Sequence, residues 1–445
     1  MGNEVKRNQW ASKMGFVLAT AGAAIGMGNL WKFPYLMGSN GGFQFLVAYL
    51  IFVVFLGVPV MVTEMSIGRI TQKSPVNAYK SLNKKATFIG VMGVICAFII
   101  LSYYSVIGGW VLKYIASYVT TLEAPANFSA YTAQPVEPVV WHIVFAVCTC
   151  LICYFGTKGI ERASTFMMPA LFVLLIILII RSITLPGAEK GLAFIFSPSQ
   201  SEFSMGSIAA ALGQVFYSLS LCMGLTVTYG SYLKKGCNIP KSSASVAALD
   251  TMAALFAGLA IFPAVFAFGE EPAQGPSLIF VTLPNVFREI PAGSIFAILF
   301  FILMFFAALT SAIALLECVV AYTIDDLHWS RRKGVLIVGI AFILLGVPSS
   351  LSFGVLKDFT ILNYSFFDFV GMITDNILMP LGGIAMSIFI GWFWGPGKII
   401  ASIEEDSGTF KLKKAWLWCV RLVTPVLIVI VTIVGFVNIY NTITA

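Results

Sequence analysis

The chain has 445 residues, of which 59% are hydrophobic and only 11% charged, and its mean hydropathy is +0.92. This composition excludes an ordinary soluble globular protein and indicates a polytopic membrane protein. The net charge of +7 comes without a basic stripe that would bind nucleic acid, so we expect it to reflect topology and contact with membrane lipid.

Eleven apolar runs are long enough to cross the roughly 30 Å hydrocarbon core of a bilayer as helices. The predicted spans cover residues 12–37, 43–69, 87–120, 139–156, 163–184, 204–233, 242–269, 293–325, 334–348, 364–394 and 415–441. With a cytoplasmic N-terminus, all but six of the 27 Lys and Arg residues fall on the inner side. The positive-inside rule therefore predicts an inner N-terminus and an outer C-terminus in a cytoplasmic (inner) membrane.

The first and sixth spans are interrupted by residues that weaken a helix. The first contains AGAAIGMGNLWKFPY (21–35) with three glycines, and the sixth contains QVFYSLSLCMGLTVTYGSY (214–232) with glycines and serines. Irregular backbone at membrane depth is tolerated only where protein or a water-filled cavity surrounds it. Because the breaks lie five spans apart, they predict an inverted repeat with a central binding site. The alternative is that these small residues only pack helices.

Acidic residues within or at the ends of apolar spans include Glu64, Asp250, Glu317 and Asp368. A carboxylate there costs roughly 2.5 kcal/mol or more unless it is paired or binds a cation, which makes such residues functional candidates. Asp250 has no lysine or arginine within a helical turn, so a metal cation or a proton would be its natural partner. For Glu64 and Glu317 we favour a structural hydrogen-bonded or shared-proton pair between two helices.

Six segments in fixed order carry a family resemblance: AGAAIGMGNLWKFPY, NGGFQFLVAYLI, GVPVMVTEMSIGR, LSYYSVIGGW, GQVFYSLSLCMG and FAALTSAIALLE. Over nearly its whole length the chain resembles the neurotransmitter:sodium symporters, in the bacterial amino-acid transporter branch with eleven helices. The resemblance implies an all-α membrane fold, with a 5+5 inverted-repeat core, unwound helices 1 and 6, and an eleventh helix. It implies one transporter domain, with repeat one at about 10–186, repeat two at about 203–395 and helix 11 at about 415–441.

The resemblance also implies one or two sodium ions and no organic cofactor. Both sites would be all-oxygen cages suited to a hard cation. The first would use the substrate carboxylate together with Ala24, Asn29, Ser218 and Asp250. The second would use the carbonyls of Gly22, Ile25 and Ala307 and the hydroxyls of Thr310 and Ser311.

A substrate amino acid would lie between the unwound segments. Its carboxylate would take the amides of Met27 and Gly28 and the hydroxyl of Tyr104. Its ammonium would meet the carbonyls of Ala24 and Tyr217 and the hydroxyls of Ser218 and Ser220. Its side chain would contact Ile100, Tyr104, Tyr217, Met223, Ser311 and Leu315. This mostly apolar lining, with one flexible thioether, predicts a hydrophobic or aromatic L-amino acid.

Four residues that depart from common family patterns refine this prediction. Relatives that carry amines have an aspartate where this chain has Gly26, so glycine favours a zwitterionic amino acid. Asp250 replaces a common asparagine, and Ala254 replaces the serine of chloride-dependent members. A fixed carboxylate can supply the charge that chloride otherwise brings, so we expect chloride-independent transport, with proton antiport through Asp250 as a further hypothesis. Cys222 replaces a common glycine and is expected to narrow the pocket or stiffen the break.

Charge placement predicts gates on both sides of the site. An outer gate would pair Lys32 with Asp368. An inner gate would pair Arg7 with Asp325, with Trp10 and Tyr232 nearby. The alternative for both pairs is ordinary snorkelling of side chains at the membrane interface.

A release path for the second sodium is predicted at the start of span 5. Gly159 and Pro169 weaken this helix, because proline lacks an amide donor and glycine costs helix stability. The alternative is a static kink. Between spans 7 and 8, the apolar segment 270–292 is expected to form short helices over the outer vestibule.

We therefore expect sodium-coupled symport of a hydrophobic or aromatic L-amino acid by alternating access. A proton-coupled amino-acid carrier of similar fold is the main alternative. An ion channel is less favoured, because no repeated filter or charged ring is present. An enzyme is not expected, because the two histidines, His142 and His328, lie near membrane edges without a nucleophile or metal-binding pattern.

Overall fold

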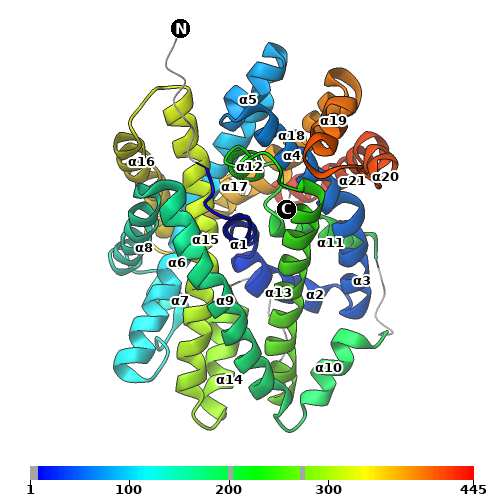
Figure 1. Ribbon diagram of the computed structural model, residues 1–445. Coiled ribbons are helices and arrows are strands. Elements are labelled where there is room, and N and C mark those ends of the chain that lie inside the picture. Colours follow the sequence, from blue (N-terminus) through cyan, green and yellow to red (C-terminus); the bar gives the residue numbers. More distant parts are fainter. Residues whose placement is uncertain (1–8, 199–203, 271–275, 445) are drawn as a thin grey trace.

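The computed structural model describes residues 9–198, 204–270 and 276–444, and helices dominate it (Figure 1). The first half contains α1 (Lys13–Ala24), η1 (Gly28–Lys32), α2 (Phe33–Ser39), α3 (Phe43–Phe52), η2 (Val53–Gly57), α4 (Val58–Thr71), α5 (Pro75–Leu82), η3 (Lys84–Ala86), α6 (Thr87–Thr121), α7 (Phe128–Thr132), α8 (Glu137–Tyr154), α9 (Gly156–Ile183) and α10 (Ala188–Phe196).

The second half begins with α11 (Met205–Ser218), α12 (Leu225–Gly230), α13 (Ile239–Ala267), η4 (Leu278–Thr282), α14 (Leu283–Glu289), α15 (Gly293–Asp325) and α16 (Arg331–Leu351). It continues with β1 (Thr360–Ile361), β2 (Tyr364–Ser365), α17 (Phe366–Met372), η5 (Ile373–Leu378), α18 (Met379–Ile388), η6 (Phe389–Trp394), α19 (Pro396–Ser407), α20 (Lys413–Trp418), η7 (Cys419–Val423) and α21 (Thr424–Thr444). The two strands pair antiparallel, with Thr360 opposite Ser365 and Ile361 opposite Tyr364.

A helical segment occupies each of the eleven predicted spans. Among the described residues, nine continuous helices are long and apolar enough to cross a membrane, and α1 with the helix of residues 28–39 forms a tenth span bent by 51°. The sixth predicted span consists of α11 and α12, separated by residues 219–224. The predicted breaks in helices 1 and 6 are therefore present.

Helix starts follow capping residues rather than the edges of apolar runs. Ser204, Asn238 and Ser330 each accept a hydrogen bond from the backbone three residues later at the starts of α11, α13 and α16. The helix of span 5 begins at Gly156, seven residues before its predicted start at 163. Hydropathy locates only the part of a helix that lies in lipid, so polar ends and short helices such as α5, α10 and α19 escape it.

The broken helix 1 lies inside the bundle, where α1 packs against α9, α13 and α15 (Figure 1). Residues 15–16 and 19–24 of α1 are all buried. Helix α14 and the turn η4 form short helices in the segment between spans 7 and 8, as predicted; residues 271–275 of that segment lie outside the described residues.

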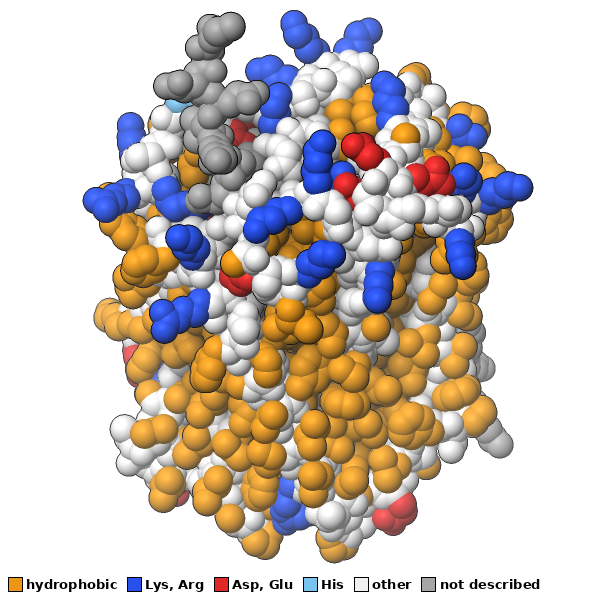
Figure 2. Space-filling view, in the orientation of Figure 1, with side chains coloured by type: hydrophobic (Ala, Val, Ile, Leu, Met, Phe, Trp, Pro, Cys, Tyr) orange, Lys and Arg blue, Asp and Glu red, His pale blue; other side chains and the backbone are white. Residues whose placement is uncertain are grey.

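The surface separates into a charged end and an apolar belt. In Figure 2, lysine and arginine side chains gather at the upper end of the molecule, where Figure 1 places α5, α12 and α19, and hydrophobic side chains cover most of the surface below. This distribution matches a membrane-embedded protein whose basic end lies in water.

Candidate functional site

Side chains from other helices pack closely against the break in helix 1. Helix α1 ends at Ala24, Ile25 has an extended backbone (φ −70°, ψ 98°), and the chain becomes helical again at Gly28. A Cβ at Gly26 would lie 2.6 Å from the Ser311 Oγ and 2.8 Å from the Tyr104 hydroxyl oxygen. Any larger residue at position 26 would therefore displace the walls of the site.

The break in helix 6 contains three residues in the left-handed backbone region. The φ angles are 50° at Ser220, 63° at Cys222 and 76° at Gly224. Cysteine is strained in this region, where glycine is not. The Cys222 amide donates to the Glu64 carboxylate at 3.3 Å, and the Thr226 hydroxyl donates to the same oxygen at 2.6 Å. Glu64 thus connects the break to α12 and stabilises the strained segment.

A first oxygen-rich cluster surrounds Asp250, which is fully buried on α13. The Asp250 carboxylate accepts hydrogen bonds from the Ser218 hydroxyl at 2.7 Å and from the Asn29 amide at 2.8 Å. Three of the four residues predicted for the first sodium site therefore meet here. The fourth, Ala24, is the last residue of α1 and is also buried.

Tyr49 is a member of this cluster that sequence reasoning missed. Its hydroxyl donates to both the Asp250 carboxylate and the Ser218 hydroxyl, at 3.2 Å each. A tyrosine in an otherwise apolar run gives little sign of function. Its only signal was the position within the segment NGGFQFLVAYLI, which carries part of the family resemblance.

A second cluster joins the end of α1 to the middle of α15. The Ser311 hydroxyl donates to the carbonyls of Gly22 at 3.3 Å and Ile25 at 3.4 Å. Thr310 directly precedes Ser311, and its hydroxyl lies 3.1 Å from the carbonyl of Ala307, one turn earlier in α15. The structure therefore brings together all five residues predicted for the second sodium site.

A cavity lies between the two clusters, bounded by both helix breaks. Its lining residues are Ala23, Ala24, Gly26, Gly28, Ile100, Tyr104, Tyr217, Ser220, Met223, Leu225, Ser311 and Leu315. Of the predicted substrate-binding residues, Met27 and Ser218 are not part of this lining. The Met27 amide donates to the Tyr104 hydroxyl at 3.1 Å, and Ser218 belongs to the Asp250 cluster.

The cavity is closed on one side by Lys32. Its ammonium group lies 2.9 Å from the Asp375 carboxylate and 4.1 Å from the centre of the Tyr217 ring. The predicted pairing of Lys32 with Asp368 is wrong. Asp368 lies in the exposed first turn of α17, where its carboxylate accepts from the Ser365 hydroxyl at 2.7 Å.

On the other side, Trp10 seals the start of α1 and is only 2% exposed. Its indole donates to the Tyr229 carbonyl at 3.0 Å, and its backbone amide donates to the Tyr232 carbonyl at 3.2 Å. The predicted proximity of Trp10 and Tyr232 is therefore observed, with ring centres 5.9 Å apart.

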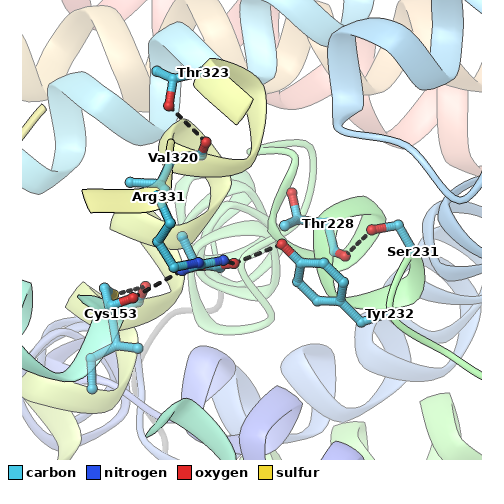
Figure 3. Close-up of polar contacts among 9 residues, drawn as sticks. Cys153, Thr228, Ser231, Tyr232, Val320, Thr323 and Arg331 are labelled. Atoms are coloured by element: carbon cyan, nitrogen blue, oxygen red, sulfur yellow. Dashed lines mark hydrogen bonds and ion pairs between the residues drawn. The ribbon is translucent and has the colours of Figure 1, made fainter. Parts of the chain in front are cut away.

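A buried ionic network extends this seal. The Tyr232 hydroxyl donates to Glu317 at 2.6 Å, and Arg331 forms two hydrogen bonds with the same carboxylate, at 2.7 and 2.8 Å. Arg331 also donates to the Cys153 carbonyl at 2.8 Å, and Figure 3 shows Arg331 and Tyr232 reaching toward one another. Glu317 on α15 thus pairs with Arg331 on α16, and Glu64 on α4 with Thr226 on α12. Each acid has a hydrogen-bonded partner on another helix, as the predicted structural role requires, but the two acids do not pair with each other.

The structure describes only one residue of the predicted inner-gate pair, Arg7 and Asp325. Arg7 lies outside the described residues, and Asp325 accepts the Ser74 amide at 2.6 Å. The neighbouring Asp326 accepts the Ser74 hydroxyl at 3.0 Å. Burial raises the pKa of Asp326 above its usual value, and the Ser74 hydroxyl opposes this rise.

The helix predicted as a release path is continuous in this structure. Both Gly159 and Pro169 lie inside α9, which runs unbroken from Gly156 to Ile183. The Glu161 carboxylate accepts hydrogen bonds from Ala11 and Ser12, the residues that precede α1. The start of α9 is therefore tied directly to the start of helix 1.

A family model described as the sodium:neurotransmitter symporter family matches residues 7–134 and 132–444. The chain belongs to the sodium:neurotransmitter symporter family. The resemblance seen in the sequence is thus confirmed, and the protein is an integral membrane protein of a transporter family.

Individual relatives in this symporter family match over most of their length. The sodium-dependent transporter YhdH of Bacillus subtilis is 41% identical, with 96% of this chain and 98% of the relative covered. The sodium- and chloride-dependent GABA transporter 2 of Bos taurus is 26% identical, with 91% and 76% covered. The crystal structure of MhsT in complex with L-phenylalanine is 44% identical, with a TM-score of 0.90 over 97% of this chain and 100% of that chain. This similarity confirms the predicted helical transporter fold.

Proposed function

We propose that this symporter carries a hydrophobic or aromatic L-amino acid into the cell together with sodium, by alternating access. The observation that carries the proposal is the cavity at the two helix breaks, with an oxygen-rich cluster on either side of it. Unwound segments offer free carbonyls to cations and free amides to an anionic group. The similar MhsT structure contains L-phenylalanine, which supports a substrate of this class.

The charge of the cavity wall favours a zwitterion over a simple amine. Among the described residues, no aspartate or glutamate lines the cavity. An amine would therefore lack a counter-charge, whereas an amino acid brings its own carboxylate. The apolar part of the wall, formed by Ile100, Met223 and Leu315, suits an aliphatic or aromatic side chain.

The two clusters would hold sodium in distinct ways. The Asp250 cluster would bind one ion through Ala24, Asn29, Ser218 and Asp250, aided by the substrate carboxylate. The α15 cluster would bind another through backbone carbonyls and the hydroxyls of Thr310 and Ser311. Because the second ion would join α1 to α15, its binding would favour closure of the inner side.

Asp250 also supports chloride-independent transport. Its buried carboxylate has three side-chain donors, from Asn29, Tyr49 and Ser218, so a negative charge is already fixed beside the proposed sodium. Ala254, one turn further along α13, is fully buried and offers no hydroxyl to an anion.

The orientation follows from the basic end of the molecule in Figure 2. We assign that end to the cytoplasm, because positively charged loops are retained on the inner side of membranes. The N-terminus would then lie inside and the C-terminus outside.

Uptake of labelled amino acids into proteoliposomes tests these assignments. We expect uptake of phenylalanine, leucine or related substrates that requires external sodium rather than potassium and is unchanged when gluconate replaces chloride. In the Asp250→Asn variant, uptake should fall and become chloride-dependent. Uptake driven by a proton gradient and indifferent to sodium would instead favour the proton-coupled carrier, and non-saturating flux would favour a channel.

A further inference from the structure

The N-cap of helix α1 forms only one of the two hydrogen bonds of a capping box within its own helix. Ser12 has an extended backbone (φ −137°, ψ 156°), and its hydroxyl accepts the Gly15 amide at 2.8 Å. In a capping box, the residue at the position of Gly15 is a glutamate or glutamine whose side chain accepts the N-cap amide. Glycine has no side chain to do this.

Glu161, on α9, supplies the missing carboxylate from another helix. One of its oxygens accepts the Ser12 amide at 3.1 Å and the Ser12 hydroxyl at 2.8 Å, and the other accepts the Ala11 amide at 2.8 Å. A negative charge at a helix N-terminus is also favoured by the helix dipole. We call this arrangement the Glu161 cap.

The Glu161 cap requires a glycine at position 15. A Cβ on Gly15 would lie 1.9 Å from a Glu161 carboxylate oxygen and 2.4 Å from its carboxyl carbon. Glycine weakens a helix relative to alanine, so a glycine at this position of α1 needs a reason. The reason is that only glycine leaves room here for the Glu161 carboxylate.

The cap joins α9 to the start of helix 1, next to the inner seal. Trp10, which seals that side, comes directly before Ala11, and Glu161 follows Gly159 by two residues in α9. We propose that Glu161 is a positioning residue that holds the inner half of helix 1, residues 11–24, closed until α9 unwinds near Gly159. This inference rests on the proposed function, because it assumes inward release.

Sodium binding and the Glu161 cap would act on the same helix. The carbonyls of Gly22 on α1 and of Ile25, which follows α1, lie within 3.4 Å of the Ser311 hydroxyl on α15. An ion there would hold α1 against α15, as the cap holds it against α9. By linkage, loss of the cap populates states with α1 displaced and lowers the apparent sodium affinity. A purely structural defect would reduce the amount of active protein without changing sodium dependence.

Sodium titration of uptake separates these two roles. In Glu161→Ala we expect the half-saturating sodium concentration to rise about two- to thirtyfold, the range that corresponds to loss of an N-cap, with the maximal rate retained at high sodium. Glu161→Gln keeps one acceptor oxygen and should give a smaller rise. The matched control is Glu189→Gln on α10, since no hydrogen bond joins Glu189 to α1 among the described residues. The half-saturating sodium concentration of Glu189→Gln should equal that of the parent protein.

A double-mutant cycle with Gly15 tests the cap without transport. Gly15→Ala should speed hydrogen–deuterium exchange in residues 11–16 about threefold or more, because it displaces Glu161. In a Glu161→Ala background the same change should slow exchange, because alanine then only strengthens the helix. Gly213→Ala in α11, where a Cβ would meet nothing within 4 Å, should leave exchange of residues 11–16 unaltered in both backgrounds.

The outcomes distinguish this inference from the proposed function. If the parent protein shows no sodium-dependent uptake, the proposed function fails, while the exchange cycle still reports on the cap. If Gly15→Ala changed hydrogen–deuterium exchange equally in the parent protein and in Glu161→Ala, the inference would be overturned. A coupled exchange effect with unchanged sodium dependence would also overturn it, because the cap would then have no part in the transport cycle.

Discussion

The two sides of the cavity, which we assign as outer and inner, are closed by different kinds of contact. On the outer side, Lys32 and Asp375 form one ion pair whose side chains remain 27% and 28% exposed. On the inner side, the Glu317 side chain is completely buried in its pair with Arg331, and Trp10 and the Glu161 cap add further contacts. The comparison shows one closure that water can reach and another that is built into the protein core.

This difference predicts unequal costs of opening. A partly exposed ion pair contributes little, because water and salt replace much of its attraction. Leaving a buried carboxylate without its partner costs much more free energy than breaking an exposed ion pair. The outer side should therefore open by small side-chain movements, whereas the inner side should open only when several helices move together.

The largest expected effect comes from removing the cation of the inner network. Arg331→Ala leaves Glu317 buried without its bidentate partner, and we expect a loss of about 3–5 kcal/mol in stability. Thermal unfolding of the purified transporter in detergent, with sodium present, would measure it.

The control for this prediction removes both charges. Arg331→Met combined with Glu317→Gln leaves no unpaired ion in the core, so most of the lost stability should return. If the double variant were as unstable as Arg331→Ala, the cost would come from lost packing and the contrast between the two closures would weaken.

A smaller effect is expected at the outer pair. Lys32→Met or Asp375→Asn should cost about 1 kcal/mol or less in the closed state, equivalent to roughly fivefold faster release of bound amino acid to the outside. Lys32→Arg should slow release, because its planar fork can bind a carboxylate through two hydrogen bonds. Dissociation of a labelled substrate after dilution, with sodium held constant, measures all three variants.

The contrast between closures also marks what the sequence could and could not predict. The spans and both breaks were predictable, because hydropathy and interrupting glycines are local signals. The association of Asn29, Ser218 and Asp250 came from the family resemblance. Tyr49 was not predicted, because a tyrosine within an apolar run has no local signature of its role.

Pairings between distant segments were the least predictable. Glu161 reads in the sequence as an ordinary acid at a membrane edge, and its partners Ala11 and Ser12 lie about 150 residues away. The outer acid was misplaced because Asp368 and Asp375 are seven residues apart, about two helical turns, and so share a helix face. The sequence cannot tell which turn lies level with Lys32, and the π-helical turn η5, which contains Asp375, further alters the local register.

The smallest expected effect tests that correction. Asp368→Asn removes a charge from the exposed first turn of α17 but keeps an oxygen that can accept the Ser365 hydroxyl, so only the helix-dipole contribution of a few tenths of a kcal/mol is lost. Substrate release to the outside should stay within about twofold of the parent rate, in the same dissociation assay that shows the faster release in Asp375→Asn. Equal acceleration in the two variants would mean that Asp368 also pairs with Lys32 during the cycle, and the outer closure would then involve two acids at different depths rather than the single ion pair seen here.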